Sequence, residues 1–165
     1  MDLVMFAPAP HPIIKKMFEI AQVTSSDVIC DLGCGDGRML ISAVKEFGAR
    51  KAIGYEIKED VCQICYDSIH KEGLEDQITL VKGDMLEADL SEVSLICLYV
   101  SVAVNEILRS KLERDANPGC RIVSYLFPMT AWKASKEIEL ARYTVGNDCY
   151  REVIYLYTIP EAFNK

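Results

Sequence analysis

The stretch VICDLGCGDGRML, residues 28–40, decides how this chain folds and what kind of ligand it can bind. An apolar run ends in Asp31, and glycines follow at positions 33, 35 and 37 before an amphipathic segment begins. A strand, a glycine turn and a helix in this order bring the backbone close to a ligand at the carboxyl end of the strand. The stretch therefore predicts a strand–loop–helix unit with a ligand site at its turn.

The charges around this loop argue against a ligand that carries phosphate. In the dinucleotide fingerprint G-x-G-x-x-G, a third glycine would stand where this chain has Arg38. Asp31 and Asp36 flank the loop, and their carboxylates would repel a pyrophosphate. A ligand with positive charge suits the loop better, although Asp36 has an alternative role as a cap of the following helix. The candidate binding residues here are Asp31, Gly33, Cys34, Gly35, Asp36 and Gly37.

Two further acids stand at the ends of the next two expected strands. Glu56 ends a strand 23 residues after Gly33, where a carboxylate can accept hydrogen bonds from both hydroxyls of a ribose. Asp84 can accept from an adenine amino group, and Ile57 and Met85 are placed to pack on the adenine faces. Acids for an amine, a ribose and an adenine fit S-adenosylmethionine. The alternative is that these residues only form turns and a charged surface.

The overall charge restricts the partners. The chain of 165 residues carries a formal net charge of −7, with a pI of about 4.9. Non-specific binding to nucleic acid requires clustered Lys and Arg side chains, so we expect no stable nucleic-acid binding. The charge is compatible with a cationic partner, but acidic proteins are also common for reasons of solubility alone.

The sequence predicts a cytoplasmic protein without a membrane span. No apolar run reaches the roughly 18 residues that a bilayer requires. The N-terminal segment MDLVMFAPAP lacks the basic and apolar regions of a signal peptide. Seven cysteines, an odd number, indicate free thiols in a reducing compartment.

Cys62 and Cys65 form a C-x-x-C pair, which is a spacing found in metal and redox sites. No second pair of this kind follows, and the pair lies in a segment with a helical pattern. We therefore predict ordinary buried or surface thiols here, and we predict no metal site.

Alternating apolar segments predict the α/β class, with a mostly parallel sheet that is covered on both faces. Strands are expected over residues 28–32, 51–57, 78–85, 93–102 and 120–126, and helices over residues 12–22, 38–48, 58–73 and 105–116. Two long segments with period two, residues 137–145 and 149–159, flank Gly-Asn-Asp and predict a hairpin. We expect one Rossmann-like domain over residues 1–165, with an extended arm over residues 1–11 and a core over residues 27–165.

The motifs DLGCGDG, GYEI and GDM together resemble those of the class I S-adenosylmethionine-dependent methyltransferases. The resemblance extends from about residue 12 to the end of the chain. It implies a seven-stranded sheet whose last strand is antiparallel to the others and is inserted by the C-terminal hairpin. It also implies S-adenosylmethionine as the cofactor, bound by Asp31, Glu56 and Asp84.

A closer resemblance is to small archaeal protein-lysine methyltransferases of broad specificity. The matching stretches are PHPIIKKMFEIAQV, DVICDLGCGDGRMLISAVKEFGARKAIGYEI, VNEILRSKLERDANPGCRIVS and YLYTI. The chain is near the minimum size for the fold, and an open site suits a macromolecular acceptor. The fourth strand ends in LYVSVAVNE, without the N-P-P-Y type of motif that amino-methylating nucleic-acid enzymes carry. We expect a monomer that methylates exposed lysines of proteins by direct in-line displacement.

Three residues in the last part of the expected fourth strand and just beyond it are the candidate catalytic group. We expect Tyr99, Ser101 and Asn105 to line the methyl-transfer side, with Tyr99 also contacting the cofactor and nearby carbonyls orienting the amine. Lysine must lose its proton first, since its free pKa is about 10.4, and desolvation beside a cation favours the neutral form. Alternatively, Tyr99 belongs to the core, and Ser101 and Asn105 cap a helix. Phe127 and Trp132 are expected to close the core beneath the hairpin.

Three other functions remain open from the sequence. A methyltransferase of this size could act on a small molecule such as a corrin precursor, or on another protein group such as isoaspartate. A module that binds the cofactor without catalysis is a second alternative, although intact acids at positions 31, 56 and 84 disfavour it. A nicotinamide oxidoreductase is a more remote alternative.

Overall fold

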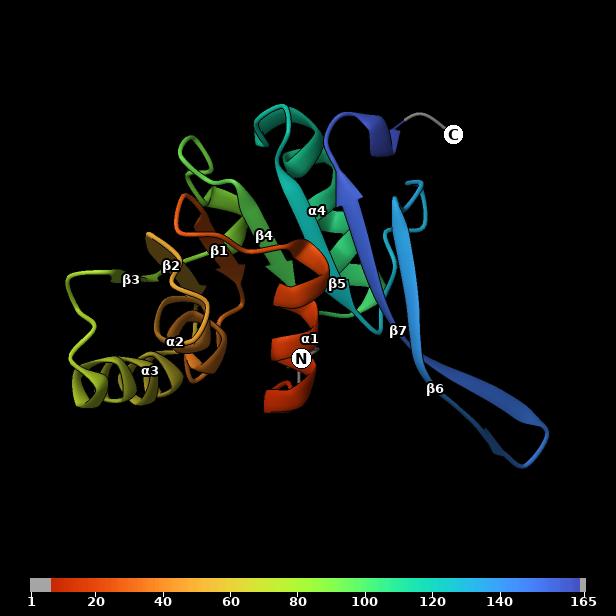
Figure 1. The fold of residues 1–165 in the computed structure, drawn as a ribbon, viewed down its shortest axis with the longest axis horizontal. Coiled ribbons are helices and arrows are strands. Elements are labelled where there is room, and N and C mark those ends of the chain that lie inside the picture. The colour runs from red at the N-terminus through yellow and green to blue at the C-terminus, as the bar shows by residue number, and fades with distance from the viewer. Residues whose placement is uncertain (1–6, 164–165) are drawn as a thin grey trace.

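The computed structural model describes residues 7–163, and these form one seven-stranded sheet with helices on both faces (Figure 1). The strands are β1 (Val28–Leu32), β2 (Lys51–Glu56), β3 (Ile78–Lys82), β4 (Leu95–Leu98), β5 (Arg121–Tyr125), β6 (Lys136–Val145) and β7 (Asp148–Thr158). The α-helices are α1 (His11–Ala21), α2 (Arg38–Lys45), α3 (Glu59–Glu72) and α4 (Val102–Asp115). Two 3₁₀ turns, η1 (Met85–Glu87) and η2 (Glu161–Phe163), complete the regular structure.

The strand order is β3-β2-β1-β4-β5-β7-β6. The pairs among β1 to β5 are parallel, and β7 is antiparallel to both β5 and β6. The expected seven-stranded, mostly parallel sheet with an antiparallel last strand is therefore confirmed. The chain runs outward from β1 through β2 to β3 and then returns to β4 on the other side of β1. This reversal makes the carboxyl ends of β1 and β4 the switch point, where ligands bind in such sheets.

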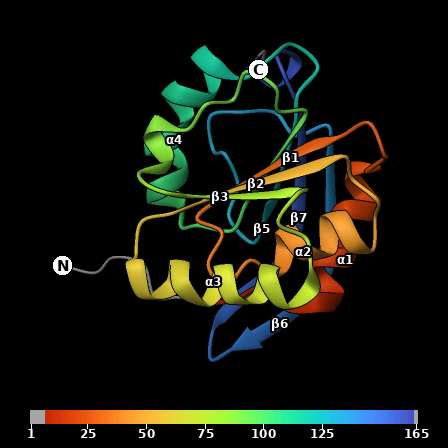
Figure 2. The same cartoon turned by 90° about the vertical axis from the view of Figure 1, so that its left-hand side faces the viewer.

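Two faces of the sheet pack against different helices. Alternate residues of β1 belong to the cores on opposite faces of the sheet. Val28 and Cys30 pack in the core that contains α4, and Ile29 packs in the core that contains α1 and α2. Figure 2 shows α1, α2 and α3 below the sheet and α4 above it. The hairpin of β6 and β7 extends beyond these layers, and most of its outer half is exposed (Figure 1).

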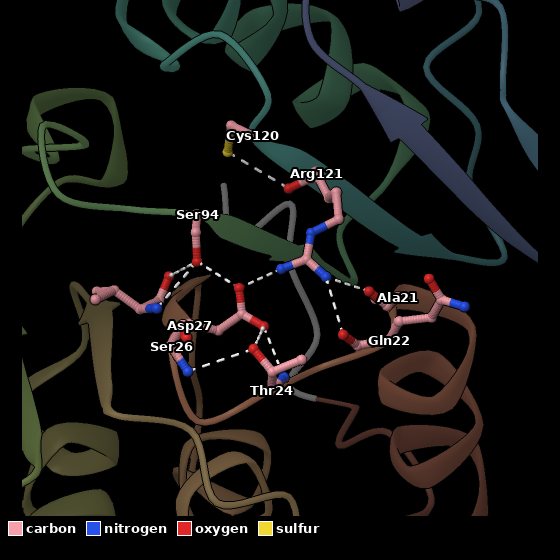
Figure 3. Close-up of polar contacts among 9 residues, drawn as sticks. Ala21, Gln22, Thr24, Ser26, Asp27, Ser94, Cys120 and Arg121 are labelled. Atoms are coloured by element: carbon pink, nitrogen blue, oxygen red, sulfur yellow. Dashed lines mark hydrogen bonds and ion pairs between the residues drawn. The ribbon is translucent and has the colours of Figure 1, made fainter.

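A charged cluster anchors α1 at the amino ends of β1 and β5, which is the end of the sheet opposite the switch point (Figure 3). Asp27, which is buried, forms an ion pair with Arg121 at the start of β5 and accepts a hydrogen bond of 2.7 Å from the Ser94 hydroxyl. The Arg121 guanidinium also donates to the carbonyl oxygens of Ala21 and Gln22, which end α1. A cation at the carbonyl end of a helix is favourable, so this cluster fixes the helix that follows the N-terminal arm.

Several boundaries differ from the sequence expectations. The fourth strand was expected over residues 93–102 and the next helix over residues 105–116, but β4 ends at Leu98 and α4 begins at Val102. The reason is that the Ser101 hydroxyl accepts a hydrogen bond of 3.3 Å from Val104 N and so caps α4. Helix capping therefore overrides the β-branched residues of this segment, which favour a strand.

Two other boundaries shift by a smaller amount. The third strand ends at Lys82 because Asp84 accepts from Leu86 N at 2.9 Å and begins η1. The expected arm over residues 1–11 ends one residue early, since α1 starts at His11 after Pro10. Residues 1–6 of that arm and residues 164–165 of the expected core lie outside the described residues.

Candidate active site

The glycine loop after β1 turns tightly because its backbone bonds to the next strand. Gly33 N and Cys34 N both donate to the carbonyl oxygen of Tyr55 at 2.9 Å. The φ angles of Gly33, Gly35 and Gly37 are 86°, 56° and 81°, and residues with a Cβ rarely adopt these positive values. A Cβ added at Gly37 would lie 2.7 Å from the Sγ of Cys65, so this position requires glycine for two reasons.

A cavity of about 490 Å³ lies at the switch point, between this loop and the carboxyl ends of β2, β3 and β4. The expected cofactor residues that line it are Asp31, Gly33, Cys34, Gly35, Asp36, Glu56, Ile57, Asp84, Met85 and Tyr99. Gly37 does not line the cavity, because it serves as the N-cap of α2. The acids of three successive strand ends therefore open onto one space, as their spacing predicts.

Asp31 is the buried acid of this cavity, and only 5% of its surface is exposed. Burial, reinforced by the carboxylates of Glu56 and Asp36, raises the pKa of Asp31 to about 7. A carboxyl group in this position has an unfavourable negative charge unless a cation binds beside it. The site is therefore electrostatically suited to a ligand with an ammonium or sulfonium group.

Glu56 is held in one orientation by backbone groups on both sides of the cavity. Its Oε2 accepts from Gly35 N at 3.2 Å, and its Oε1 accepts from Ile57 N at 2.9 Å and Lys58 N at 3.0 Å. The carboxylate thus links the glycine loop to the end of β2. Asp84 is fixed in a similar way, because its Oδ1 accepts from Leu86 N.

Asp36 is paired with the Arg38 side chain. The Arg38 side chain donates to both carboxylate oxygens of Asp36, at 3.1 Å from Nε and 2.7 Å from Nη2. Burial acts against ionisation of Asp36, but the hydrogen bonds from Arg38 outweigh it and hold the pKa of this carboxyl below its usual range. Arg38 also donates from Nη1 to the carbonyl oxygen of Ala9 at 3.2 Å, which holds the N-terminal arm against the cavity.

The far wall of the cavity is aromatic. Tyr99, Ser101 and Phe127 line it, where β4 and β5 end. The rings of Tyr99 and Phe127 are nearly parallel, with centroids 6.5 Å apart and planes at 17°. Tyr99 also contacts the Tyr125 ring at 4.9 Å. This wall offers apolar surface for the stem of a long side chain and hydrogen-bond acceptors for its polar end.

Asn105 lies behind this wall. It is fully buried, and its Nδ2 donates to the carbonyl oxygens of Phe127 at 3.0 Å and Pro128 at 3.4 Å. Asn105 is not a lining residue, which corrects the expectation that it faces the methyl-transfer side. Trp132 packs in the core against Tyr157, as expected.

Several lining residues were not expected from the sequence. Ala7, Pro8 and Ala9 of the arm line the cavity, where Arg38 bonds to the carbonyl oxygen of Ala9, a contact that no local pattern indicates. Phe127 was expected in the core, but it lines the cavity. Arg38 did carry a signal, since it stands where a dinucleotide site would have glycine.

The C-x-x-C pair is structural in its surroundings. Cys65 is buried beneath the glycine loop, and the Cys62 thiol donates to the carbonyl oxygen of Glu56 at 3.3 Å. Within residues 7–163, no group of three or more His, Cys, Asp or Glu side chains is arranged to hold a metal ion. None of the helices in the same range combines the length and the apolar character that crossing a membrane requires.

Comparison with known proteins identifies related methyltransferases. Residues 31–136 match the family described as the ANTKMT methyltransferase domain. A protein-lysine N-methyltransferase of Saccharolobus islandicus (strain REY15A) is 37% identical over 158 residues, which cover 96% of this chain and 95% of that protein. The adenine nucleotide translocase lysine N-methyltransferase of Mus musculus is 27% identical over 62% of this chain and 44% of that protein.

A solved structure shares both the fold and part of the sequence. The crystal structure of an RNA methyltransferase from Salinibacter ruber in complex with S-adenosyl-L-homocysteine superposes with a TM-score of 0.85. The two sequences are 35% identical, and the match covers 94% of this chain and 95% of the Salinibacter ruber chain. The family match extends over more than half of the sequence and includes the glycine loop and all three strand-end acids. The chain therefore belongs to the ANTKMT methyltransferase domain family and is a methyltransferase.

Proposed function

We propose that this protein transfers a methyl group from S-adenosylmethionine to lysine side-chain amines of proteins by direct in-line displacement. The observation that carries the proposal is that one cavity is lined both by three strand-end acids and by the aromatic residues Tyr99 and Phe127. The acids suit the cofactor, and the wall suits a lysine side chain. The resemblance to the Saccharolobus islandicus enzyme over nearly the whole chain supports the same acceptor.

The residues present fit this cofactor. The charged groups that raise the pKa of Asp31 are the carboxylates of Glu56 and Asp36, and these negative surroundings suit the amino group of the methionine part. Glu56 is oriented by backbone donors on both sides and retains acceptor capacity for the ribose hydroxyls. Asp84, which is exposed, lines the cavity next to Met85 and suits the adenine. When bound, S-adenosylmethionine supplies an activated methyl group on a sulfonium centre.

The protein's part in the reaction is alignment and desolvation. Tyr99 and Phe127 enclose the acceptor side chain, and carbonyl groups near Ser101 accept from the amine and aim its lone pair at the methyl group. Alignment of this kind contributes about 7–11 kcal/mol in well-oriented systems. The low-polarity wall favours the neutral amine over the ammonium form, so the proton leaves to solvent before transfer. No covalent intermediate with the protein is needed.

An RNA acceptor is the second candidate, because the Salinibacter ruber protein is named an RNA methyltransferase. The net charge of −7 disfavours it, since phosphate contacts require clustered basic side chains. A small-molecule acceptor and a non-catalytic binding module are the remaining alternatives.

The test is transfer of radiolabelled methyl from S-adenosylmethionine in a heat-treated extract of the source cells. Separate samples are digested with protease and with nuclease, and labelled peptides are mapped by mass spectrometry. We expect label that only protease releases and that maps to lysine. The Glu56→Ala variant, with its cofactor site damaged, serves as the control for background methylation.

Each other outcome identifies a different function. Label released by nuclease would replace the lysine acceptor with RNA. Label that resists both enzymes and stays in the small-molecule fraction would indicate a metabolite. Absence of label, with the cofactor still bound by calorimetry, would favour a binding module.

We further propose that the protein works as a monomer in the cytoplasm. All seven cysteines are free thiols, which supports a reducing compartment. Light scattering of the purified protein tests the oligomeric state, and cell fractionation tests the location.

A further inference from the structure

The turn that follows β5 contains an unfavourable backbone conformation. Leu126 has a φ of 66°, in the left-handed region that a branched side chain seldom adopts. The turn is tight, because Phe127 N donates to the carbonyl oxygen of Tyr125 at 2.8 Å. Such strained residues persist only where the surrounding structure holds them, and they are concentrated at functional sites.

Two buried side chains hold this turn through one carbonyl group. The Ser124 hydroxyl donates to the carbonyl oxygen of Phe127 at 2.5 Å, and Asn105 Nδ2 donates to the same oxygen at 3.0 Å. Asn105 also donates to the carbonyl oxygen of Pro128 at 3.4 Å. Asn105 is in the first helical turn of α4, where its backbone N–H bonds to the carbonyl oxygen of Ser101 at 2.9 Å. The amide therefore connects the start of α4 to the turn after β5.

Asn105 makes these bonds at an energetic cost. Its side chain is fully buried, and its Oδ1 has no hydrogen-bond partner among residues 7–163. An unpaired buried carbonyl oxygen is unfavourable, and an apolar residue of similar size would avoid the penalty. The presence of an amide side chain at position 105 is therefore explained by the hydrogen bonds that its nitrogen donates to the turn that carries Phe127.

The position of this turn decides the shape of the acceptor wall. Phe127 lines the cavity, and its ring is next to the Tyr99 ring. Ser101, whose carbonyl oxygen accepts from the backbone N–H of Asn105, also lines the cavity. Movement of the turn would therefore displace Phe127 relative to both of these residues. The glycine loop and Glu56 have their own backbone bonds and would stay in place.

We propose that Asn105 is a positioning residue for the acceptor, which holds the strained turn of residues 124–128 so that Phe127 and Ser101 present the acceptor amine to the cofactor. The inference rests on the proposed methyl transfer and names a determinant of its acceptor side. Asn105 acts through Phe127, and it contacts neither the acceptor nor the cofactor.

The experiment compares Asn105→Ala with Thr130→Val. Thr130 forms an exposed hydrogen bond of 2.7 Å with Glu106 of α4, so its removal breaks another connection between the same two segments, outside the cavity. For Asn105→Ala we expect kcat/KM for a labelled lysine peptide to fall about 10- to 100-fold, because a misplacement of about 1 Å can cost a hundredfold. The dissociation constant for S-adenosylhomocysteine should stay within about twofold. Thr130→Val should change neither quantity.

A double-mutant cycle with Phe127→Ala separates positioning from general destabilisation. If Asn105 acts through Phe127, the two substitutions together should reduce kcat/KM little more than either one alone. Hydrogen exchange adds a readout that does not depend on the acceptor. Exchange of the backbone amides within residues 124–130 should rise in Asn105→Ala, while exchange within residues 33–37 should not.

A purely structural role would give different results. Fully additive effects of Asn105→Ala and Phe127→Ala, or equal losses of acceptor and cofactor binding, would overturn the inference. Unchanged exchange in residues 124–130 would overturn it as well. Should the wild-type protein label a different acceptor, the lysine proposal alone fails, since the cycle and the exchange measurement can be run with the acceptor that is labelled.

Discussion

The cofactor side and the acceptor side of the cavity are held in place by different means. On the cofactor side, backbone N–H groups of the loop and strand ends bond to Tyr55 and Glu56. On the acceptor side, Asn105 and Ser124 side chains hold a strained turn that carries Phe127. The distance along the chain does not separate the two sides, since Gly35 and Glu56 are 21 residues apart and Asn105 and Phe127 are 22 residues apart. The difference is that glycines and strand-end acids mark the cofactor side in the sequence, whereas no motif marks the side-chain bonds that hold the acceptor side.

The largest effect is expected on the cofactor side from Glu56→Ala. The variant loses the acceptor for Gly35 N and the acceptor that we propose for the ribose, and each hydrogen bond to a charged group is worth roughly 1.5–3 kcal/mol. We expect affinity for S-adenosylmethionine to fall at least about a hundredfold by calorimetry, since a factor of ten corresponds to about 1.4 kcal/mol. Glu87→Ala, in the exposed η1 turn, is the control and should bind normally. Affinity within about threefold of wild type would remove Glu56 from the site.

Gly54→Ala tests how closely the cofactor side is packed. A Cβ at Gly54 would lie 2.5 Å from Leu40 Cδ1 and 2.9 Å from Cys34 Cβ, so the loop or α2 must move. Overpacking of this kind costs about 1–3 kcal/mol of unfolding free energy, measured by denaturant unfolding. Gly83→Ala is a matched control, because its nearest atom is 3.9 Å away. Equal stability of the two variants would contradict the close approach.

Cofactor binding should depend on pH through Asp31. Its pKa of about 7 in the free protein means that a bound proton must leave before a cation binds, so affinity should rise with pH. Between pH 6 and pH 8 we expect about a tenfold gain, equivalent to roughly 1.4 kcal/mol. Asp31→Asn should bind weakly at every pH, and a pH profile of wild type as flat as that of the variant would count against this role.

The same group makes a prediction about the stability of the free protein. The pKa of Asp31 is raised on folding, so the protonated form is the one that folding favours. Its contribution to stability is present below the unfolded pKa of about 4 and is lost as pH rises through about 7. Asp31→Asn should therefore reduce the decline in unfolding free energy over this range.

The smallest effect is expected on the acceptor side, from Ser101→Ala. The hydroxyl caps α4 by accepting from Val104 N, and loss of such a cap costs about 1 kcal/mol. Denaturant unfolding should show this loss, and Ser101→Asp should largely avoid it, since aspartate also caps helices. If both variants are equally unstable, the serine matters for another reason than capping.

Most of the fold followed from short patterns. The apolar strands, the glycine loop and the C-terminal hairpin lie close to where the sequence placed them, because burial and turn chemistry act over a few residues. The error at the end of β4 has a specific cause. Val100 and Val102 favour a strand, but the hydrogen bond from Val104 N to Ser101 begins a helix there.

The candidate site also has one part that the sequence predicted and one part that it did not. Ten of the eleven residues named for the cofactor line the cavity, since strand ends in a parallel sheet meet at one edge. Asn105 was expected on the wall together with Tyr99 and Ser101, yet its side chain in α4 bonds to the carbonyl oxygens of Phe127 and Pro128. The arm residues Ala7 to Ala9 could not be placed, because their position depends on the anchoring of α1.

By itself, the sequence determined the class of fold, the loop and the three acids that suit a cationic adenosine ligand. These features are visible as short motifs and as the alternation of strands and helices along the chain. Only the tertiary structure decided which side chains form the acceptor wall and what holds them. Phe127, Asn105 and Leu126 acquire their roles from contacts between segments that are distant in the chain, and such contacts leave no periodic pattern in the sequence.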